Sequence, residues 1–191
     1  MRIGARGTML GAVPLLAAAL ALSGPPETGL SAAPAAAACE SADGEPGEIT
    51  RGQARDAVAC LINSRRATRG KGRLEDNSSL RKAAGRHTKH MQRRGCFAHE
   101  CPGEKDLAGR IYDTGYLPCG CSWGIGENIA WGGRELGTPG SIVQSWMESA
   151  AHRRTILNGD YRHIGIGVAW GTPSNPGAEA ATLTADFGYK R

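Results

Sequence analysis

The stretch HIGIGVAW at residues 163–170, followed by ATLTADFG at residues 181–188, decides the fold of this chain. In both segments every second residue is apolar, a period of two that is typical of strands with one buried face. A loop rich in Pro and Gly separates them, so we expect the two strands to pair antiparallel. Gly165 and Gly167 on the opposite face of the first strand indicate that a further layer packs closely there.

Helical patterns precede this strand pair. Thr50 and Gln53 form a capping box, and apolar residues at helical spacing follow until Gly70 and Gly72 end the helix. Further helices are predicted near residues 78–95 and 106–113, and after a Thr138 cap with Pro139 at the first position. Helices first and paired strands last, without strand–helix alternation, predict an α+β fold with helices on both sides of a sheet.

Composition sets the class of protein. The 191 residues are 40% hydrophobic and 21% charged, which excludes wholesale disorder and suits one domain with an extension. The charge of +5 is modestly basic. A basic stripe follows the second predicted helix, and we interpret it as a solvated surface: Arg81, Lys82, Arg86, Lys89 and Arg93. No aromatic residues are interleaved with these charges, so we expect no nucleic-acid partner.

Residues 1–38 have the features of a secretory signal peptide. Arg2 and Arg6 precede a short apolar run, and an Ala-rich stretch with a predicted cleavage near residues 36–38 follows. A lipid anchor on Cys39 is the alternative. It is disfavoured because Ala36 stands where a branched apolar residue is usual and because the apolar run ends far upstream. No other segment approaches the roughly 20 apolar residues of a membrane span. We therefore expect a secreted, soluble and monomeric mature protein without a transmembrane segment.

Six cysteines lie beyond this leader, and an even number in an exported chain predicts disulfides. A Cys39–Cys60 bond would pin the N-terminal lead-in to the first helix. Cys119 and Cys121 are too close to bond each other without strain, so we expect each to reach back to Cys96 or Cys101. A four-cysteine zinc site is the alternative, although Cys-x-Cys is not the usual zinc spacing.

Two of the five histidines stand in segments with other functional marks. His99 lies between two cysteines, and His152 follows a helix. Together with Glu127 they could hold a divalent transition metal with one open position, although spacing alone is weak support. We interpret His87, on the apolar face of the second helix, as a hydrogen-bonded structural residue. His90 is expected to be solvated, and His163 to stand at a strand entrance.

A series of short motifs resembles one known family. They are, in order, CLINSR at 60–65, AGRH at 84–87, FAH at 97–99, GENIA at 126–130, WM at 146–147, HR at 152–153, ILN at 156–158, GIGV at 165–168 and DFG at 186–188. Their order over residues 56–189 is similar to the CAP superfamily, which contains the SCP domains of cysteine-rich secretory, antigen 5 and pathogenesis-related proteins, in its bacterial form.

The resemblance implies a three-layer α-β-α sandwich with a central antiparallel sheet over residues 56–191, after a lead-in at 39–55. It also implies a central cleft in which two histidines and two acids can hold zinc or another divalent cation. By motif these are His99, Glu127 and His152. Ser149 stands where the second acid is usual, and Glu148, one position early, is an optional fourth member.

The most favoured function is a secreted, non-enzymatic binding module, since members of this family share a fold but not an activity. Its ligand would be an extracellular lipid or a cell-envelope component. One alternative is a metal-dependent, peptidase-like hydrolase in which His99 and His152 hold the metal and Glu127 serves as ligand or base. Another is a lipid- or sterol-binding protein, and a third makes the trio a purely structural polar cluster.

Overall fold

The computed structural model describes residues 39–117 and 120–191. The predicted signal peptide lies outside the described residues. In the described part of the chain, none of the helices has the length and apolar character that crossing a bilayer requires. The elements are, in chain order, α1 (Arg51–Ala67), β1 (Glu75–Asp76), α2 (Ser78–Arg94), α3 (Leu107–Tyr112), β2 (Trp123–Gly133), the 3₁₀ helix η1 (Arg134–Gly137), α4 (Pro139–Glu148), α5 (Ala150–Ile156), β3 (His163–Trp170) and β4 (Ala180–Lys190).

The sheet has the strand order β1-β3-β4-β2. β3 and β4 pair antiparallel as predicted, with Ile164 opposite Phe187, and β2 pairs antiparallel with the other side of β4. The two-residue strand β1 runs parallel to β3, so the sheet is mixed and not wholly antiparallel. Two residues are too short for any sequence period, and β1 is held by backbone hydrogen bonds around Glu75.

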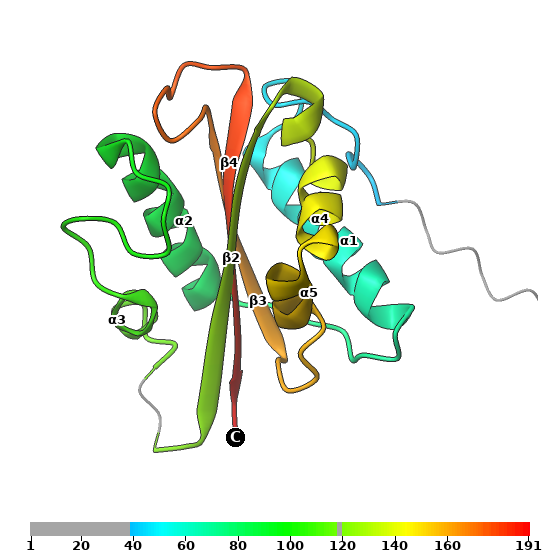
Figure 1. Cartoon of the computed structure of the whole chain (residues 1–191). Helices are drawn as coiled ribbons and strands as arrows, with labels where there is room; N and C mark the ends of the chain where they lie inside the picture. The colour runs from blue at the N-terminus through cyan, green and yellow to red at the C-terminus, as the bar shows by residue number, and fades with distance from the viewer. Residues whose placement is uncertain (1–38, 118–119) are drawn as a thin grey trace, which may run out of the picture. The chain divides into compact units, whose positions relative to one another are not determined.

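Helices cover both faces of this sheet, which confirms the α+β sandwich (Figure 1). α2 and α3 lie on one side, and α1, α4 and α5 lie on the other. Gly165 and Gly167 permit the approach of α2, because a Cβ at either position would collide with the backbone of α2 at Arg81 or Ala84. The prediction that these glycines mark a close layer is therefore confirmed.

The main hydrophobic core lies between the sheet and the α1/α4/α5 layer. Trp146 of α4 is its largest fully buried side chain, and its indole N–H donates to the carbonyl of Ile129 on β2 at 3.1 Å. Burying such a side chain is worth about 3 kcal/mol, provided that its N–H finds a partner. This packing fixes α4, and hence the following helix α5, against the outer strand β2.

The helix ends follow the predicted signals. Thr50 and Gln53 form the capping box of α1. Asn77 caps α2, which ends at Gly95 in the left-handed conformation (φ 60°). Thr138 caps α4. These local rules hold because caps satisfy backbone groups that a helix leaves unpaired at its ends.

The disulfide pattern differs in part from the prediction. Cys39–Cys60 is present as expected. Cys96, however, bonds Cys101 and not Cys119 or Cys121, because the chain reverses after Gly95 and brings the two Cα atoms to 6.0 Å. Cys121 is itself disulfide-bonded, and Cys119 lies outside the described residues. Since every described cysteine is oxidised, a four-cysteine zinc site is also wrong.

The Cys39–Cys60 bond should stabilise the domain more than Cys96–Cys101. It closes a loop of 21 residues against one of five, and loop-closure entropy then predicts losses of about 3 and about 2 kcal/mol when each bond is removed. Guanidinium unfolding of the Cys39→Ser/Cys60→Ser and Cys96→Ser/Cys101→Ser variants measures both. Equal losses would contradict the dependence on loop length, and negligible losses would show that neither bond stabilises the fold.

Candidate functional site

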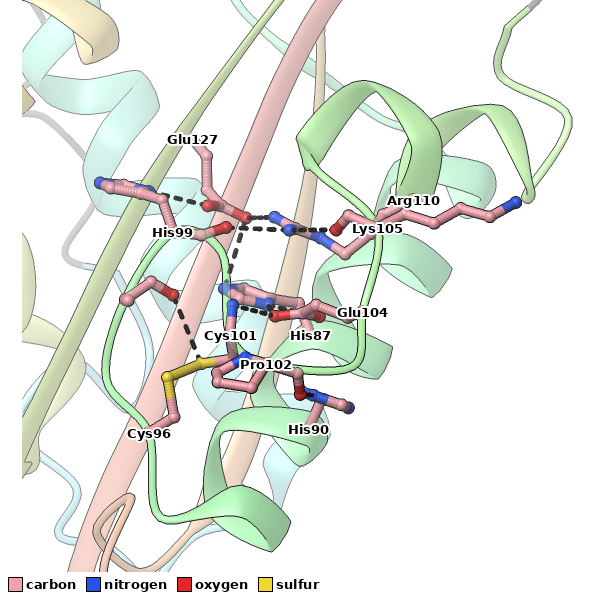
Figure 2. The surroundings of a disulfide bond; sticks show 11 residues. His87, His90, Cys96, His99, Cys101, Pro102, Glu104, Lys105, Arg110 and Glu127 are labelled. Carbon is pink, nitrogen blue, oxygen red and sulfur yellow. Dashed lines mark hydrogen bonds and ion pairs between the residues drawn. A yellow bond between two sulfur atoms is a disulfide. The ribbon is translucent and has the colours of Figure 1, made fainter.

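A buried carboxylate, Glu127 of β2, lies at the centre of the candidate site. Its side chain is only 1% exposed, and both of its oxygens are engaged. Oε1 accepts from His99 Nδ1 at 2.8 Å, and Oε2 accepts from Arg110 Nη2 at 2.6 Å. Figure 2 shows Glu127 between these two side chains, with the His99 ring on the side away from Arg110.

The neighbouring segments are shaped to deliver these partners. Asp106 caps α3 by accepting from the Gly109 N–H, and Arg110 follows in the last turn of that short helix. Besides Glu127, the Arg110 guanidinium donates to the carbonyl oxygens of His99 and Lys105. Arg110 therefore holds the loop at residues 99–105 and the Glu127 carboxylate in one arrangement.

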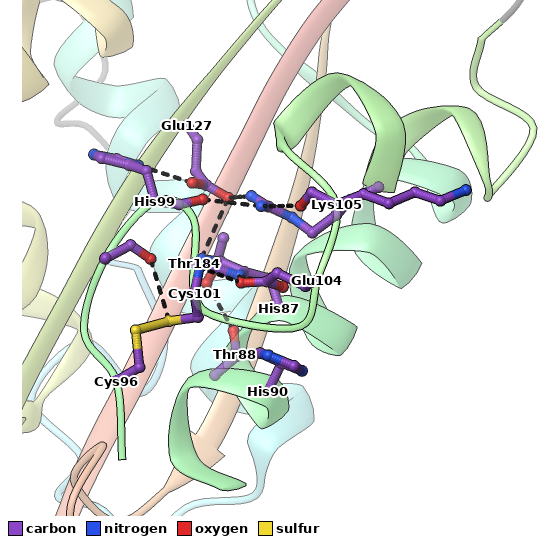
Figure 3. A network of polar contacts seen from close by, with 12 residues as sticks. His87, Thr88, His90, Cys96, His99, Cys101, Glu104, Lys105, Glu127 and Thr184 are labelled. Atoms are coloured by element: carbon purple, nitrogen blue, oxygen red, sulfur yellow. Dashed lines mark hydrogen bonds and ion pairs between the residues drawn. A yellow bond between two sulfur atoms is a disulfide. The ribbon is translucent and has the colours of Figure 1, made fainter. Parts of the chain in front are cut away.

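A second buried pair, His87 and Glu104, lies close to Glu127 (Figure 3). His87 of α2 is fully buried, and its Nδ1 lies 2.9 Å and 3.0 Å from the two carboxylate oxygens of Glu104. Its Nε2 faces Glu127 Oε2 at 3.8 Å. Glu104 also accepts from the Cys101 N–H, beside the disulfide. The prediction that His87 is a hydrogen-bonded structural residue is confirmed.

Glu127 and Asp186 are cross-strand partners, so their carboxyl groups share one face of the sheet. Burial raises the pKa of Glu127, but the His99 hydrogen bond and the Arg110 charge outweigh it, and the net pKa is lowered. Burial raises the pKa of Asp186 well above its usual value, and the Glu127 charge raises it further. The surroundings therefore favour the ionised form of Glu127 and the neutral form of Asp186.

His99 covers this network from the solvent side, with 59% of its side chain exposed. The hydrogen bond to Glu127 raises the pKa of His99 against the opposing effect of burial. A raised pKa means that protonated His99 stabilises the fold at low pH. That contribution is lost as the pH rises through the raised pKa, above about 6.5.

His152, the second predicted histidine, lies on α5, on the other side of β2 (Figure 1). Asn128, next to Glu127, donates to the His152 carbonyl at 3.2 Å. Burial lowers the pKa of His152, and the charge of His99 lowers it further, so the imidazole is neutral at pH 7. His152 lines a cleft of about 220 Å³ together with Phe97 and Trp131.

The remaining candidates lie elsewhere. Glu148 is exposed and accepts from Gln144 of its own helix at 2.8 Å, while Ser149 separates α4 from α5. His90 is half-buried instead of solvated, because its Nε2 lies 3.1 Å from the Pro102 carbonyl oxygen. His163 begins β3, as expected, and faces the Tyr116 hydroxyl.

Three residues of the network were not predicted from the sequence: Glu104, Arg110 and Asp186. Arg110 and Glu104 stand in short polar segments without a distinguishing period. Asp186 did leave a signal, because it occupies the strand face on which the glycines indicate a covering layer. An acid at such a position is expected to be buried.

The three-ligand metal set expected from the sequence does not fit this arrangement. Both oxygens of Glu127 already accept from His99 and Arg110, and a guanidinium 2.6 Å away opposes a second cation. Within residues 39–117 and 120–191, no group of three or more His, Cys, Asp or Glu side chains is placed to hold a metal ion. We therefore derive no chemical step through a metal.

Comparison with known proteins agrees with the fold. The model of the cysteine-rich secretory protein family, CAP, matches residues 60–175. The chain is 34% identical over 111 residues to the protein YkwD of Bacillus subtilis, covering 58% of this chain and 40% of that protein. It thus spans less than half the length of the curated relatives that it matches.

Two solved structures show the same fold at low identity. An extracellular protein with an SCP domain from Bacillus anthracis has a TM-score of 0.58 at 22% identity, over 74% of this chain and 44% of that one. An outer surface protein of Borrelia burgdorferi has a TM-score of 0.62 at 19% identity, over 75% of this chain and 97% of that one. Both confirm the predicted fold.

Replacing the two buried acids should have opposite consequences. Glu127→Gln removes the counter-ion of a buried Arg110 and should cost about 3 kcal/mol or more of unfolding free energy at pH 7. Asp186→Asn keeps a neutral group of the same shape and should be neutral or stabilising. Urea unfolding of both variants beside the unsubstituted protein measures these changes.

The Asp186→Asn comparison also has a pH signature. A folded-state pKa above the unfolded one means that stability falls as the pH rises above about 3.8. The advantage of the variant should therefore grow between pH 4 and 7, by at most about 1.4 kcal/mol per pH unit. A pH-independent loss as large as that of Glu127→Gln would show that Asp186 is ionised in the fold.

Zinc titration tests the metal expectation directly. With Glu127 engaged by Arg110, we expect no stoichiometric, submicromolar zinc binding by the chelator-treated protein at pH 7 in isothermal titration calorimetry. Tight binding that His99→Ala/His152→Ala abolishes would instead establish the ligand set expected from the sequence.

Proposed function

The chain belongs to the CAP family of cysteine-rich secretory proteins, and from this premise we propose that it is a secreted, non-enzymatic binding module. Its ligand would be a partly apolar, extracellular molecule, such as a lipid or a cell-envelope component, held in the cleft beside His152. The family alone does not choose a ligand, since one fold hosts many functions. The class of ligand therefore has to be inferred from the residues that line the cleft.

The observation that carries it is the pair of exposed aromatic side chains at the cleft. Phe97 is 45% exposed and Trp131 is 50% exposed, and both line the cleft with the neutral His152 imidazole. Large apolar side chains gathered in a depression mark binding surfaces. The imidazole and the Ser145 hydroxyl add polar groups, a combination that suits an amphipathic ligand.

The size of the cleft sets how much of a ligand it holds. About 220 Å³ is below the roughly 300–1,000 Å³ of sites that enclose a whole small molecule. The cleft therefore suits one segment of a ligand, such as the end of an acyl chain, while the remainder stays outside. A cleft of this size supports a ligand held at the surface of the protein and not one enclosed in its interior.

The contacts of the site favour binding over catalysis. Among the residues that the structure describes, no serine, threonine or cysteine side chain hydrogen-bonds the imidazole of His99 or His152, as an activated nucleophile would require. Glu127 has a lowered pKa and two engaged oxygens, so it is a poor proton acceptor. The hydrolase alternative would need Glu127 to leave Arg110.

Binding of a fluorescent fatty acid tests the proposal. We expect saturable binding that Phe97→Ala/Trp131→Ala weakens at least about tenfold, because truncating an aromatic side chain that a ligand covers costs about 1 kcal/mol or more, and about 1.4 kcal/mol is tenfold. Tyr112→Ala is the matched control, since Tyr112 is 55% exposed but outside the cleft. Fluorescence titration with unlabelled competitor gives the affinities.

Two results would contradict a binding module of this kind. One is affinity that the cleft variant and the Tyr112→Ala control change equally, which would place the ligand elsewhere. The other is turnover of ester or peptide substrates that a chelator abolishes, zinc restores and His99→Ala/His152→Ala removes, which would establish the hydrolase.

A further inference from the structure

A larger hollow, of about 440 Å³, lies on the α2/α3 side of the molecule. It is separate in its lining residues from the cleft beside His152. The face of α2 that carries Arg86, His90 and Arg93 forms one wall. The opposite wall comes from the loop after Cys101 and from α3, and Figure 2 shows His90, Glu104, Lys105 and Arg110 around it.

The charge of this hollow is unbalanced. Four of its lining side chains are cationic and two are acidic. Of the two acids, Glu104 is already held by His87 and the Cys101 N–H, and Asp113 accepts from Lys105. Arg86 and Arg93 are exposed and have no ion pair or side-chain hydrogen bond within the described residues.

The other two cations differ in how free they are to move. Arg110 is buried and fixed by Glu127 and by two carbonyl oxygens, so its charge is already compensated within the protein. Lys105 pairs with Asp113 at 2.8 Å, but both side chains are largely exposed. An exposed pair of this kind is worth little, so Lys105 can exchange Asp113 for a stronger anion at small cost.

The sequence of α2 makes this concentration of charge costly without an anion. The helix contains six Arg or Lys residues and no acid. Like charges four residues apart, such as Lys82 with Arg86 and Lys89 with Arg93, destabilise a helix by a few tenths of a kcal/mol per pair. An anion bound at Arg86 and Arg93 would reduce this repulsion.

We propose that the hollow between α2 and α3 binds a multiply charged, phosphate-bearing ligand through Arg86, Arg93 and Lys105. A guanidinium group can donate two parallel hydrogen bonds to the oxygens of one phosphate group. A phosphate group also accepts more hydrogen bonds than a carboxylate. The volume lies in the range of small-molecule sites, which suits more than one phosphate group. Because Phe and Trp are absent from the described lining, stacking of nucleic-acid bases is not part of the proposal.

Titration with tripolyphosphate, followed by calorimetry in low salt, tests the site. We expect saturable one-to-one binding that Arg86→Gln/Arg93→Gln weakens at least about tenfold. Lys82→Gln/Lys89→Gln is the matched control, since it removes the same charge from the same helix outside the hollow and should weaken binding less than about threefold. All four side chains are exposed, so we expect both variants to fold. Circular dichroism verifies this.

Vesicle sedimentation then identifies the source of the phosphate. Retention on phosphatidylglycerol vesicles that Arg86→Gln/Arg93→Gln alone abolishes would support the site and assign it to a lipid headgroup. Tripolyphosphate binding without vesicle retention would support it and assign it to a soluble or polymer-borne phosphate.

Binding of neither probe, or equal weakening by the two double variants, would overturn the proposal, because general attraction to a basic helix then accounts for the result. Fatty-acid binding by Arg86→Gln/Arg93→Gln should stay unchanged. This separates failure of the phosphate site from failure of the cleft.

Discussion

The charge of Glu127 is the constraint on which the site depends. A carboxylate that is 1% exposed loses its hydration, and several kcal/mol of that loss must be recovered from partners within the protein. Arg110 supplies the opposite charge and His99 the second donor, while burial and the Glu127 charge raise the pKa of Asp186 and favour its neutral form. These requirements bring β2, β4, α3 and the loop after the Cys96–Cys101 bond into a single arrangement.

One polar network therefore supports two surfaces. On one side of Glu127, His99 and the strand β2 lead to the aromatic cleft on which His152 lies. On the other side, Arg110 and Glu104 form part of the basic hollow between α2 and α3. Arg110 also donates to the carbonyl groups of His99 and Lys105, so the loop that borders both surfaces is held by the same guanidinium. This arrangement gives the buried charges a positioning role, because Arg110 holds both the loop and the Glu127 carboxylate in place.

Much of the fold was predictable because it depends on neighbours in sequence. The caps at Thr50 and Thr138 and the period of two in β3 and β4 are local, and each is present as expected. β2 was not predicted, since its glycines and polar residues interrupt the alternation, and β1 is too short to show any. The Cys96–Cys101 pairing was also missed, because it depends on a chain reversal after Gly95 that spacing alone does not reveal.

Local patterns along the chain are enough to indicate the class of fold, the helices on both faces of the sheet, and Glu127, His99 and His152 as candidate site residues. The partners of Glu127, in contrast, follow from the packing of segments that are distant in sequence. Its partners come from positions 17 and 28 residues away, and no local pattern encodes which of several charged side chains arrives within hydrogen-bonding distance. The same holds for Arg86 and Arg93, which form part of an ordinary basic stripe along α2 until α3 and the Cys101 loop pack beside them and form a hollow. Periodicity specifies which face of an element is buried, whereas the pairing of charges depends on how those elements pack.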